Sequence, residues 1–230
     1  MLFQLAMNQG NEVIVLYNGY SDLVTNQSSN VSIMKANCTC TLIRNAKYSV
    51  IVDTMTPWDG DKIKESLQKY NLVPDMIDYV ISTHGHADHV GNNNLFLNAK
   101  HIVGNSISKV DEFYLHPFDQ GISYYIGTEN EENRIEITPT PGHTLDSISV
   151  LLNTDRYKKV AIVGDLFEKE EDLIDPCIWL DAGSEDKIKQ EQHRLRMLHT
   201  CDYIVPGHGP MFKVTDQARM NYKKLCDEIK

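Results

Sequence analysis

The feature that most constrains this chain is the segment 82–92, in which four potential metal ligands fall within six positions: His84, His86, Asp88 and His89. The apolar run 77–81 precedes it directly, a pattern typical of a buried strand that feeds a tight loop. In such a loop His84 and His86 can turn toward one point, while Asp88 and His89 turn toward a second. The segment therefore predicts two half-built metal sites, because imidazole and carboxylate groups suit zinc, iron or manganese. A histidine-rich surface loop that binds metal adventitiously is the alternative interpretation.

Further potential ligands follow three other strand-like runs. Residues 134–138 are stopped by prolines and a glycine just before His143, residues 160–164 end in Asp165, and residues 203–206 lead to His208 between two glycines. Strands that deliver ligands to loop tips bring them together at one edge of a sheet. We therefore expect these three side chains to join the segment 84–89 in one cluster.

The ligand set, in this order, resembles the signature of the metallo-β-lactamase superfamily over about residues 40–215. The resemblance implies two divalent ions, with zinc as the first expectation and iron or manganese as alternatives at one position. The implied ligands are His84, His86 and His143 for the first ion and Asp88, His89 and His208 for the second, with Asp165 shared by both. Asp53, which ends the early strand-like run 50–52, is implied to support the ligands without binding an ion.

The resemblance also implies hydrolysis, with Asp88 and Asp165 as the catalytic carboxylates and a metal-bound hydroxide as the nucleophile. Two divalent ions would lower the pKa of a shared water from its bulk value toward about 7. One ion would polarise the substrate's carbonyl or phosphoryl oxygen, and the other would receive the charge that develops on the leaving group. No side-chain nucleophile is then required.

The order of the predicted elements indicates an α/β protein. We expect strands at 12–20, 38–44, 48–53, 78–81, 100–103, 147–152, 159–163 and 203–205, and helices after Pro57 and at 90–97, 185–199 and 215–229. Residues 21–30 are predicted to form a polar loop. Together with the resemblance, the pattern predicts an αββα sandwich of two mixed sheets with helices outside, forming one domain over residues 1–230.

Composition narrows the setting in which such a protein works. The net charge of −10 argues against a general affinity for nucleic acid, although two divalent ions would supply positive charge where a phosphodiester substrate binds. No run of about eighteen apolar residues occurs, so we expect no membrane span. The five scattered cysteines indicate reduced thiols. We therefore expect a cytoplasmic protein, with the nucleus as a second location.

The substrate is suggested by segments that extend beyond the ligands. Residues 53–54, 57–58, 83–96, 163–168 and 205–214 resemble those of a small, single-domain branch of the superfamily. That branch is associated with endonucleolytic cleavage of RNA, notably replication-dependent histone transcripts, and with homodimers. The resemblance therefore implies an endoribonuclease acting on RNA such as histone pre-mRNA, a homodimer, and no organic cofactor.

Two other classes of function stay open at this point. The first is a thioesterase of the glyoxalase II type, acting on S-acyl glutathione or another small ester, although few residues follow His208 to bind a glutathione moiety. The second is a binding or regulatory protein that keeps its metals without turnover. His116 lies in the aromatic loop 113–118 between the metal motifs, so we single it out as a candidate substrate contact outside them. The alternative is that this loop only covers the core.

Overall fold

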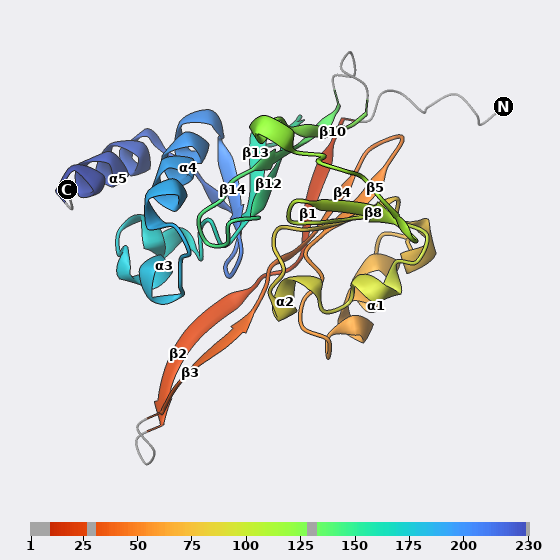
Figure 1. The fold of residues 1–230 in the computed structure, drawn as a ribbon, viewed down its shortest axis with the longest axis horizontal. Helices are drawn as coiled ribbons and strands as arrows, with labels where there is room; N and C mark the ends of the chain where they lie inside the picture. The colour runs from red at the N-terminus through yellow and green to blue at the C-terminus, as the bar shows by residue number, and fades with distance from the viewer. Residues whose placement is uncertain (1–9, 27–30, 128–132, 229–230) are drawn as a thin grey trace.

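The computed structural model describes residues 10–26, 31–127 and 133–228, and two large mixed sheets form its centre (Figure 1). The first sheet has the order β1 (Glu12–Tyr17), β4 (Cys40–Arg44), β5 (Ser49–Val52), β6 (Tyr79–Ser82), β7 (Lys100–Val103), β8 (Ser106–Lys109) and β9 (Glu112–Phe113). The second has the order β10 (Tyr124–Ile126), β11 (Ile135–Pro139), β12 (Ile148–Thr154), β13 (Lys158–Gly164), β14 (Tyr203–Pro206) and β15 (Phe212–Lys213).

The helices lie outside the sheets. They are α1 (Gly60–Gln68), α2 (Ala87–Val90), α3 (Cys177–Asp181), α4 (Lys187–Thr200) and α5 (Asp216–Glu228), and short 3₁₀ turns cover Pro74–Met76, Asn93–Leu95, Asp119–Gly121 and Glu170–Leu173. Helix α1 adjoins the first sheet, whereas α4 and α5 adjoin the second (Figure 1).

Alternation along the strands explains this layering. In β5, Val50 and Val52 belong to the core between the two sheets, whereas Ile51 points the other way, toward Ile63 and Leu67 of α1. The second sheet behaves in the same manner, since its outer face packs on α4 and α5 in a separate buried cluster. The predicted αββα sandwich of two mixed sheets is confirmed.

One part of the predicted fold was wrong. Residues 21–30 were expected to form a loop, but β2 (Tyr20–Asn26) pairs antiparallel with β3 (Val31–Asn37), and the turn 27–30 lies outside the described residues. This two-stranded ribbon extends away from both sheets (Figure 1). The polar residues of 21–30 indicate a loop because the ribbon stands clear of both sheets, so no face packed on the core marks the strands.

The predicted helix at 90–97 is also placed differently. Helix α2 begins at Ala87 and ends at Val90, and a separate 3₁₀ turn covers Asn93–Leu95. Gly91 lies between the two elements, and its N–H donates to the carbonyl of Met55, 3.1 Å away. Its Cα packs so closely on the backbone of residues 55–57 that a Cβ would collide there. The interruption anchors the segment that carries the first four predicted ligands.

Two expectations from composition concern cysteines and membranes. Cys38, Cys40 and Cys201 are buried free thiols and Cys177 is an exposed one, while the side chain of Cys226 lies outside the described residues.

Among the helices that the structure describes, none combines the length and apolar character needed to cross a bilayer.

The carboxyl ends of the central strands lie at one edge of the sandwich. Strand β5 runs parallel to β6 in the first sheet, and β13 runs parallel to β14 in the second. The two sheets are joined at this edge, because Ile148 N donates to Thr83 O at 2.9 Å and Thr39 N donates to Gly207 O at 2.6 Å. Loops that leave these strands therefore meet in a small volume.

Candidate metal centre

The predicted ligands converge at that edge from four separate strand ends. Two groups have donor atoms within 4.8 Å of one another: His84, His86, His143 and Asp165 in the first, and Asp88, His89 and His208 in the second. The segment after β6 supplies part of each group, as its spacing predicts. The two clusters are placed for a dinuclear divalent metal site.

In the first group three imidazoles point ring nitrogens at a common point. His84 Nε2 lies 2.9 Å from His86 Nδ1, and His143 Nε2 lies 3.1 Å from the same atom. His84 and His143 are buried, whereas His86 is exposed on the open side of the group. Three imidazoles and a carboxylate, closed on one side and open on the other, form the donor set of a catalytic metal position.

Asp165 lies between the two groups. Its Oδ2 is 3.5 Å from His84 Nε2, 3.4 Å from His143 Nε2 and 3.3 Å from His208 Nε2. Its Oδ1 is 3.3 Å from His89 Nε2. One carboxylate therefore faces imidazoles of both groups, which is the placement required of a bridging ligand.

The second group contains the buried polar atoms that most need a partner. Asp88 Oδ2 lies 3.9 Å from His89 Nε2 and 3.8 Å from His208 Nε2, too far for hydrogen bonds. Among the described side chains, Asp88 Oδ2, His89 Nε2 and Asp165 Oδ1 are buried without any hydrogen-bond partner. Unpaired buried acceptors are costly, and a divalent cation among them would satisfy all three.

The outer ring nitrogens are held so that the inner ones face the cluster. His143 Nδ1 donates to Gly183 O at 2.9 Å, and His208 Nδ1 donates to Asn37 O at 3.0 Å. His89 Nδ1 lies 3.0 Å from Asp53 Oδ2. A proton fixed on the outer nitrogen leaves a lone pair on the inner one, which is the tautomer that binds metal. The surrounding residues therefore fit the two ions that the ligand set implies.

The charges of the site stabilise positive charge at its centre. Burial would raise the pKa of Asp165, but His89, His208 and His84 lower it well below its usual value. Burial opposes protonation of His208, but the carboxylate of Asp165 raises its pKa to about 9. The pKa of His84 is lowered by burial and by neighbouring His89. An ionised carboxylate surrounded by imidazoles is an environment made for a cation.

Comparison with known proteins decides the family. A family profile described as the metallo-beta-lactamase superfamily matches residues 35–208. The chain belongs to this superfamily. The match covers all the predicted metal ligands, so the site described above lies inside the shared domain.

Two relatives of this superfamily member are vertebrate proteins that share one name. Metallo-beta-lactamase domain-containing protein 1 of Xenopus laevis is 37% identical over 90% of this chain and 84% of its own length. The human protein of the same name is 34% identical over 75% of this chain and 62% of its own length. The chain thus matches less than two thirds of the human protein.

Solved structures of other metallo-β-lactamase proteins share the fold. A Staphylococcus aureus protein described as a probable metal-dependent hydrolase covers 92% of this chain and 95% of its own, with 15% identity and a TM-score of 0.62. The Bacillus thuringiensis protein AiiA, solved with N-decanoyl-L-homoserine at its active site, covers 84% and 88% with 18% identity and a TM-score of 0.58. The superfamily and the His/Asp clusters together support a metal-dependent hydrolase.

The metal groups open into a cavity of about 340 Å³. One wall is the ribbon β2–β3, which contributes Leu23 and Met34, residues that pair directly across the ribbon and so share a face. The lining also includes Asp181 and Ala182 at the end of α3. The strands that the sequence did not predict therefore form part of the site.

His116 lies elsewhere. It lines a different cavity, with Tyr114 and Phe118, in the segment that follows β8 and β9, and it does not line the metal cleft. Its φ is +52°, an uncommon conformation for a residue other than glycine. The structure thus separates this sequence-predicted contact from the metal ligands.

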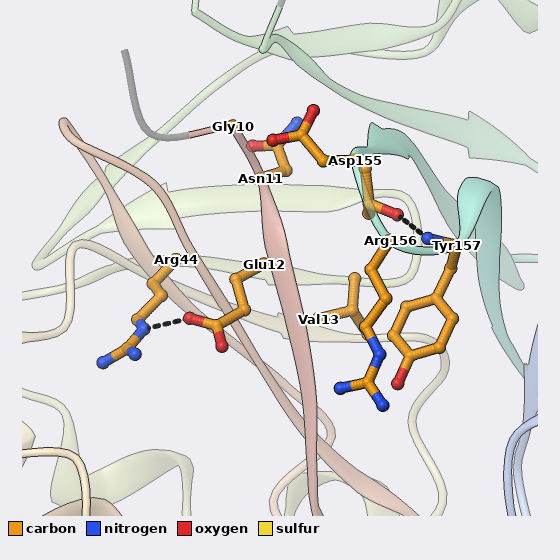
Figure 2. Close-up of a pocket in the computed structure, with 9 residues that line it drawn as sticks. Gly10, Asn11, Glu12, Val13, Arg44, Asp155, Arg156 and Tyr157 are labelled. Carbon is orange, nitrogen blue, oxygen red and sulfur yellow. Dashed lines mark hydrogen bonds and ion pairs between the residues drawn. The ribbon is translucent and has the colours of Figure 1, made fainter. Parts of the chain in front are cut away.

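A further cavity of about 300 Å³ lies between the start of β1 and the turn that joins β12 to β13 (Figure 2). Its charges are partly matched within the wall, because Arg44 Nε lies 2.6 Å from Glu12 Oε2 and Arg156 lies over the ring of Tyr157. None of the predicted metal ligands lines it. The metal centre is therefore the stronger candidate for the functional site, because all seven predicted ligands lie there.

Asp53 does not face the metal groups directly but contacts the predicted ligand His89 and the backbone beside His84. Its Oδ1 accepts from Thr83 N at 2.8 Å, while its Oδ2 lies 3.0 Å from His89 Nδ1. We expect Asp53→Asn to weaken metal binding by about 10–100-fold, because an amide cannot hold the His89 tautomer equally well. Competition with a fluorescent chelator measures the change. Asp61→Asn, an exposed residue of α1, serves as the matched control and should bind as the parent does.

Two glycines near the ligands give a second matched pair. A Cβ at Gly207 would collide with Oδ1 of Asp165, whereas a Cβ at Gly85 would meet nothing within 4 Å. We expect Gly207→Ala to cost about 1–3 kcal/mol of stability by overpacking and to weaken metal binding. Gly85→Ala should change stability by less than about 0.5 kcal/mol. Thermal melting of both variants tests this, and equal melting temperatures would contradict the packing described here.

Proposed function

We propose that this chain is a dinuclear metal-dependent hydrolase in which Asp165 bridges the two ions. The observation that carries the proposal is the position of that carboxylate, with Oδ2 within 3.5 Å of His84 and 3.3 Å of His208. Two bound divalent ions would supply Lewis acidity and a water acidified toward neutral pH. The ligands would be the seven side chains of the two groups: His84, His86, Asp88, His89, His143, Asp165 and His208.

The chain's own side chains would then orient the reaction. The side chain of Asp88 is 20% exposed, so it lies at the boundary between the second group and the cleft. Its carboxylate would accept a hydrogen bond from the attacking water and direct its lone pair toward the substrate. His86 and His143 also line the cleft, so a substrate oxygen can approach the first group from the same side as the water.

The first candidate substrate is RNA. Two ions that share one carboxylate suit phosphodiester cleavage, because a metal pair can stabilise both the attacking and the leaving oxygen. The motif resemblance to a branch associated with cleavage of histone transcripts supports this candidate. The name metallo-beta-lactamase domain-containing protein 1, carried by the Xenopus laevis and human relatives, states no substrate, so RNA cleavage is a proposal for this chain. A homodimer, and a place in the cytoplasm or nucleus, also stay predictions.

The cleft lining favours a second candidate, a small ester or thioester with an apolar acyl group. Leu23 and Met34 present apolar surface beside the metal groups. The described residues that line this cleft include Asp181 and Glu168 but no lysine or arginine. An RNA strand carries a negative charge at each phosphate and gains most from basic contacts. An uncharged acyl chain would instead bury itself against the apolar wall.

One experiment separates the candidates. The zinc-reconstituted protein is incubated with a fluorescent single-stranded RNA, with S-lactoylglutathione and with an acyl lactone, and kcat/KM is compared. Leu23→Ser and Met34→Ser serve as probes: for an acyl substrate they should raise KM several-fold with little change in kcat, whereas RNA cleavage should be unaffected. RNA turnover alone supports the nuclease, ester turnover alone supports the second candidate, and no turnover of any substrate would contradict the hydrolase proposal.

A further inference from the structure

Glu168 is a buried carboxylate at the metal centre that the seven-residue ligand set does not use. It is 2% exposed and lines the same cleft as the ligands. Its donor atom forms a third close group with Asp165 and His208, all within 4.8 Å of one another. It lies three positions after Asp165, outside the spacing that made the other ligands recognisable in the sequence.

The backbone fixes Glu168 in this place. Its N–H donates to Asp172 Oδ2 at 2.8 Å, and its carbonyl accepts from His208 N at 2.8 Å. Asp172 is held in turn by the buried guanidinium of Arg194, at 2.8 Å. The backbone of Glu168 is therefore hydrogen-bonded directly to the predicted ligand His208. The buried pair of Asp172 and Arg194 fixes the other side of the same residue.

The carboxylate itself lacks a partner of the usual kind. Its ion-pair neighbour is His208, with Nε2 and Oε2 3.9 Å apart, and no hydrogen bond to this carboxylate occurs within the part of the chain that the structure describes. A buried carboxylate without donors is costly. Asp88 Oδ2 and Asp165 Oδ1, in the same region, are likewise buried and unpaired. A cation among the three carboxylates would relieve this cost.

The distances suit a shared ion. Zinc and similar ions bind nitrogen and oxygen at about 2.0–2.2 Å, so two donors of one ion lie at most about 4.3 Å apart. His208 meets this condition with Glu168 at 3.9 Å, with Asp88 at 3.8 Å and with Asp165 at 3.3 Å. Each of the three carboxylates therefore lies within the span of two donors of one ion when measured from His208, and Glu168 shares a close group with His208 and Asp165.

We propose that Glu168 is an additional ligand of the second ion and gives that position a preference for an oxygen-seeking cation such as Mn²⁺. This inference rests on the proposed dinuclear site. The first position has three imidazoles and the shared Asp165, whereas the second would have two imidazoles and three carboxylates, counting Asp165. Carboxylate-rich sites suit manganese, whereas imidazole suits zinc. The two positions would thus differ in the metal that they select.

The test is metal binding without any substrate. The chelator-stripped protein is titrated with Mn²⁺, followed by electron paramagnetic resonance of the free ion, and with Zn²⁺ in competition with a fluorescent chelator. For Glu168→Gln we expect Mn²⁺ affinity at the second position to fall by at least about 10-fold. Zn²⁺ affinity at the first position should change less than about 2-fold. Glu170→Gln, an exposed neighbour in the following 3₁₀ turn, is the matched control and should behave as the parent does.

The outcomes distinguish this inference from the proposed function. If the parent binds two ions and Glu168→Gln binds both as tightly, Glu168 is not a ligand, while the dinuclear site stands. If the parent binds fewer than two ions under all conditions, the dinuclear proposal fails and the inference fails with it. Thermal melting checks that the glutamine variant is folded, and Glu168→Ala repeats the titration if it is not. A loss of Mn²⁺ affinity in a folded variant supports the assignment.

Discussion

Asp165→Asn should reduce hydrolysis by on the order of a thousand-fold and reduce the bound metal from two ions to one or none. The reason is geometric as well as electrostatic. Oδ2 faces three imidazoles and Oδ1 faces His89, so an amide must turn its NH₂ group toward one of the two ligand groups. An NH₂ group cannot bind a cation, and the negative charge shared by both ions is lost. Metal analysis together with steady-state kinetics measures both effects.

Asp155→Asn is the matched control for this variant. It removes a carboxylate from the exposed turn between β12 and β13, beside the second cavity (Figure 2). Its activity and metal content should equal those of the parent. If Asp165→Asn kept two ions and full activity, the carboxylate would not bridge them, and activity seen in a metal-free variant would indicate a contaminating enzyme.

Arg194→Met should cause the largest loss of stability of any single substitution considered for this chain, about 3–5 kcal/mol. Arg194 is fully buried and donates to Tyr222 Oη at 2.6 Å, to Leu166 O at 2.7 Å and to Asp172 at 2.8 Å. Removing the guanidinium leaves the Asp172 carboxylate buried without its countercharge. A change of this size corresponds to a drop of roughly 10 °C in melting temperature for a chain of this length. Urea unfolding gives the free energy directly.

Two further variants serve as controls for the loss of stability in Arg194→Met. Lys189→Ala removes a solvent-exposed cation of the same helix, whose partner is Asp186 at 3.1 Å, and should cost at most about 1 kcal/mol. The double variant Arg194→Met with Asp172→Asn should lose less than the sum of the two single losses, since no unpaired charge is left. Strict additivity would show that the pair does not interact as the geometry requires.

The convergence of the candidate ligands could be predicted from the sequence because these residues follow strands. Apolar runs that end in His84, Asp165 and His208 define both the strand and the point where it ends, and the sheet topology then brings those points together. The alternation of Val50, Ile51 and Val52 likewise follows from a strand covered on both faces, which explains why the two-sheet sandwich could be predicted.

The elements that the sequence failed to predict are those without a buried face. Strands β2 and β3 stand clear of both sheets, so apolar residues such as Leu23 and Ile33 are exposed and no core confirms their alternation. Glu168 escaped notice for a related reason. An acidic residue in an acidic stretch is typical of a solvated turn. The burial of Glu168 depends on Asp172, which accepts from its backbone N–H, and on Arg194, which is distant in the sequence and pairs with Asp172 only in the folded chain.

His116 shows the limit of reasoning from the order of motifs. A loop that lies between metal motifs in the sequence was a candidate to line the cleft, but the chain leaves the cleft after β7 and places this loop at the far edge of the first sheet, beyond β8 and β9. Strands β2 and β3, which precede every metal motif, form one wall of the metal cleft.

The central claim is that seven side chains hold two ions on either side of Asp165, and anomalous X-ray diffraction at a metal absorption edge tests it most directly. We expect two anomalous peaks about 3.5–4 Å apart, one among His84, His86 and His143 and the other among Asp88, His89 and His208. A single peak, or a second peak away from Asp165, would contradict the dinuclear site.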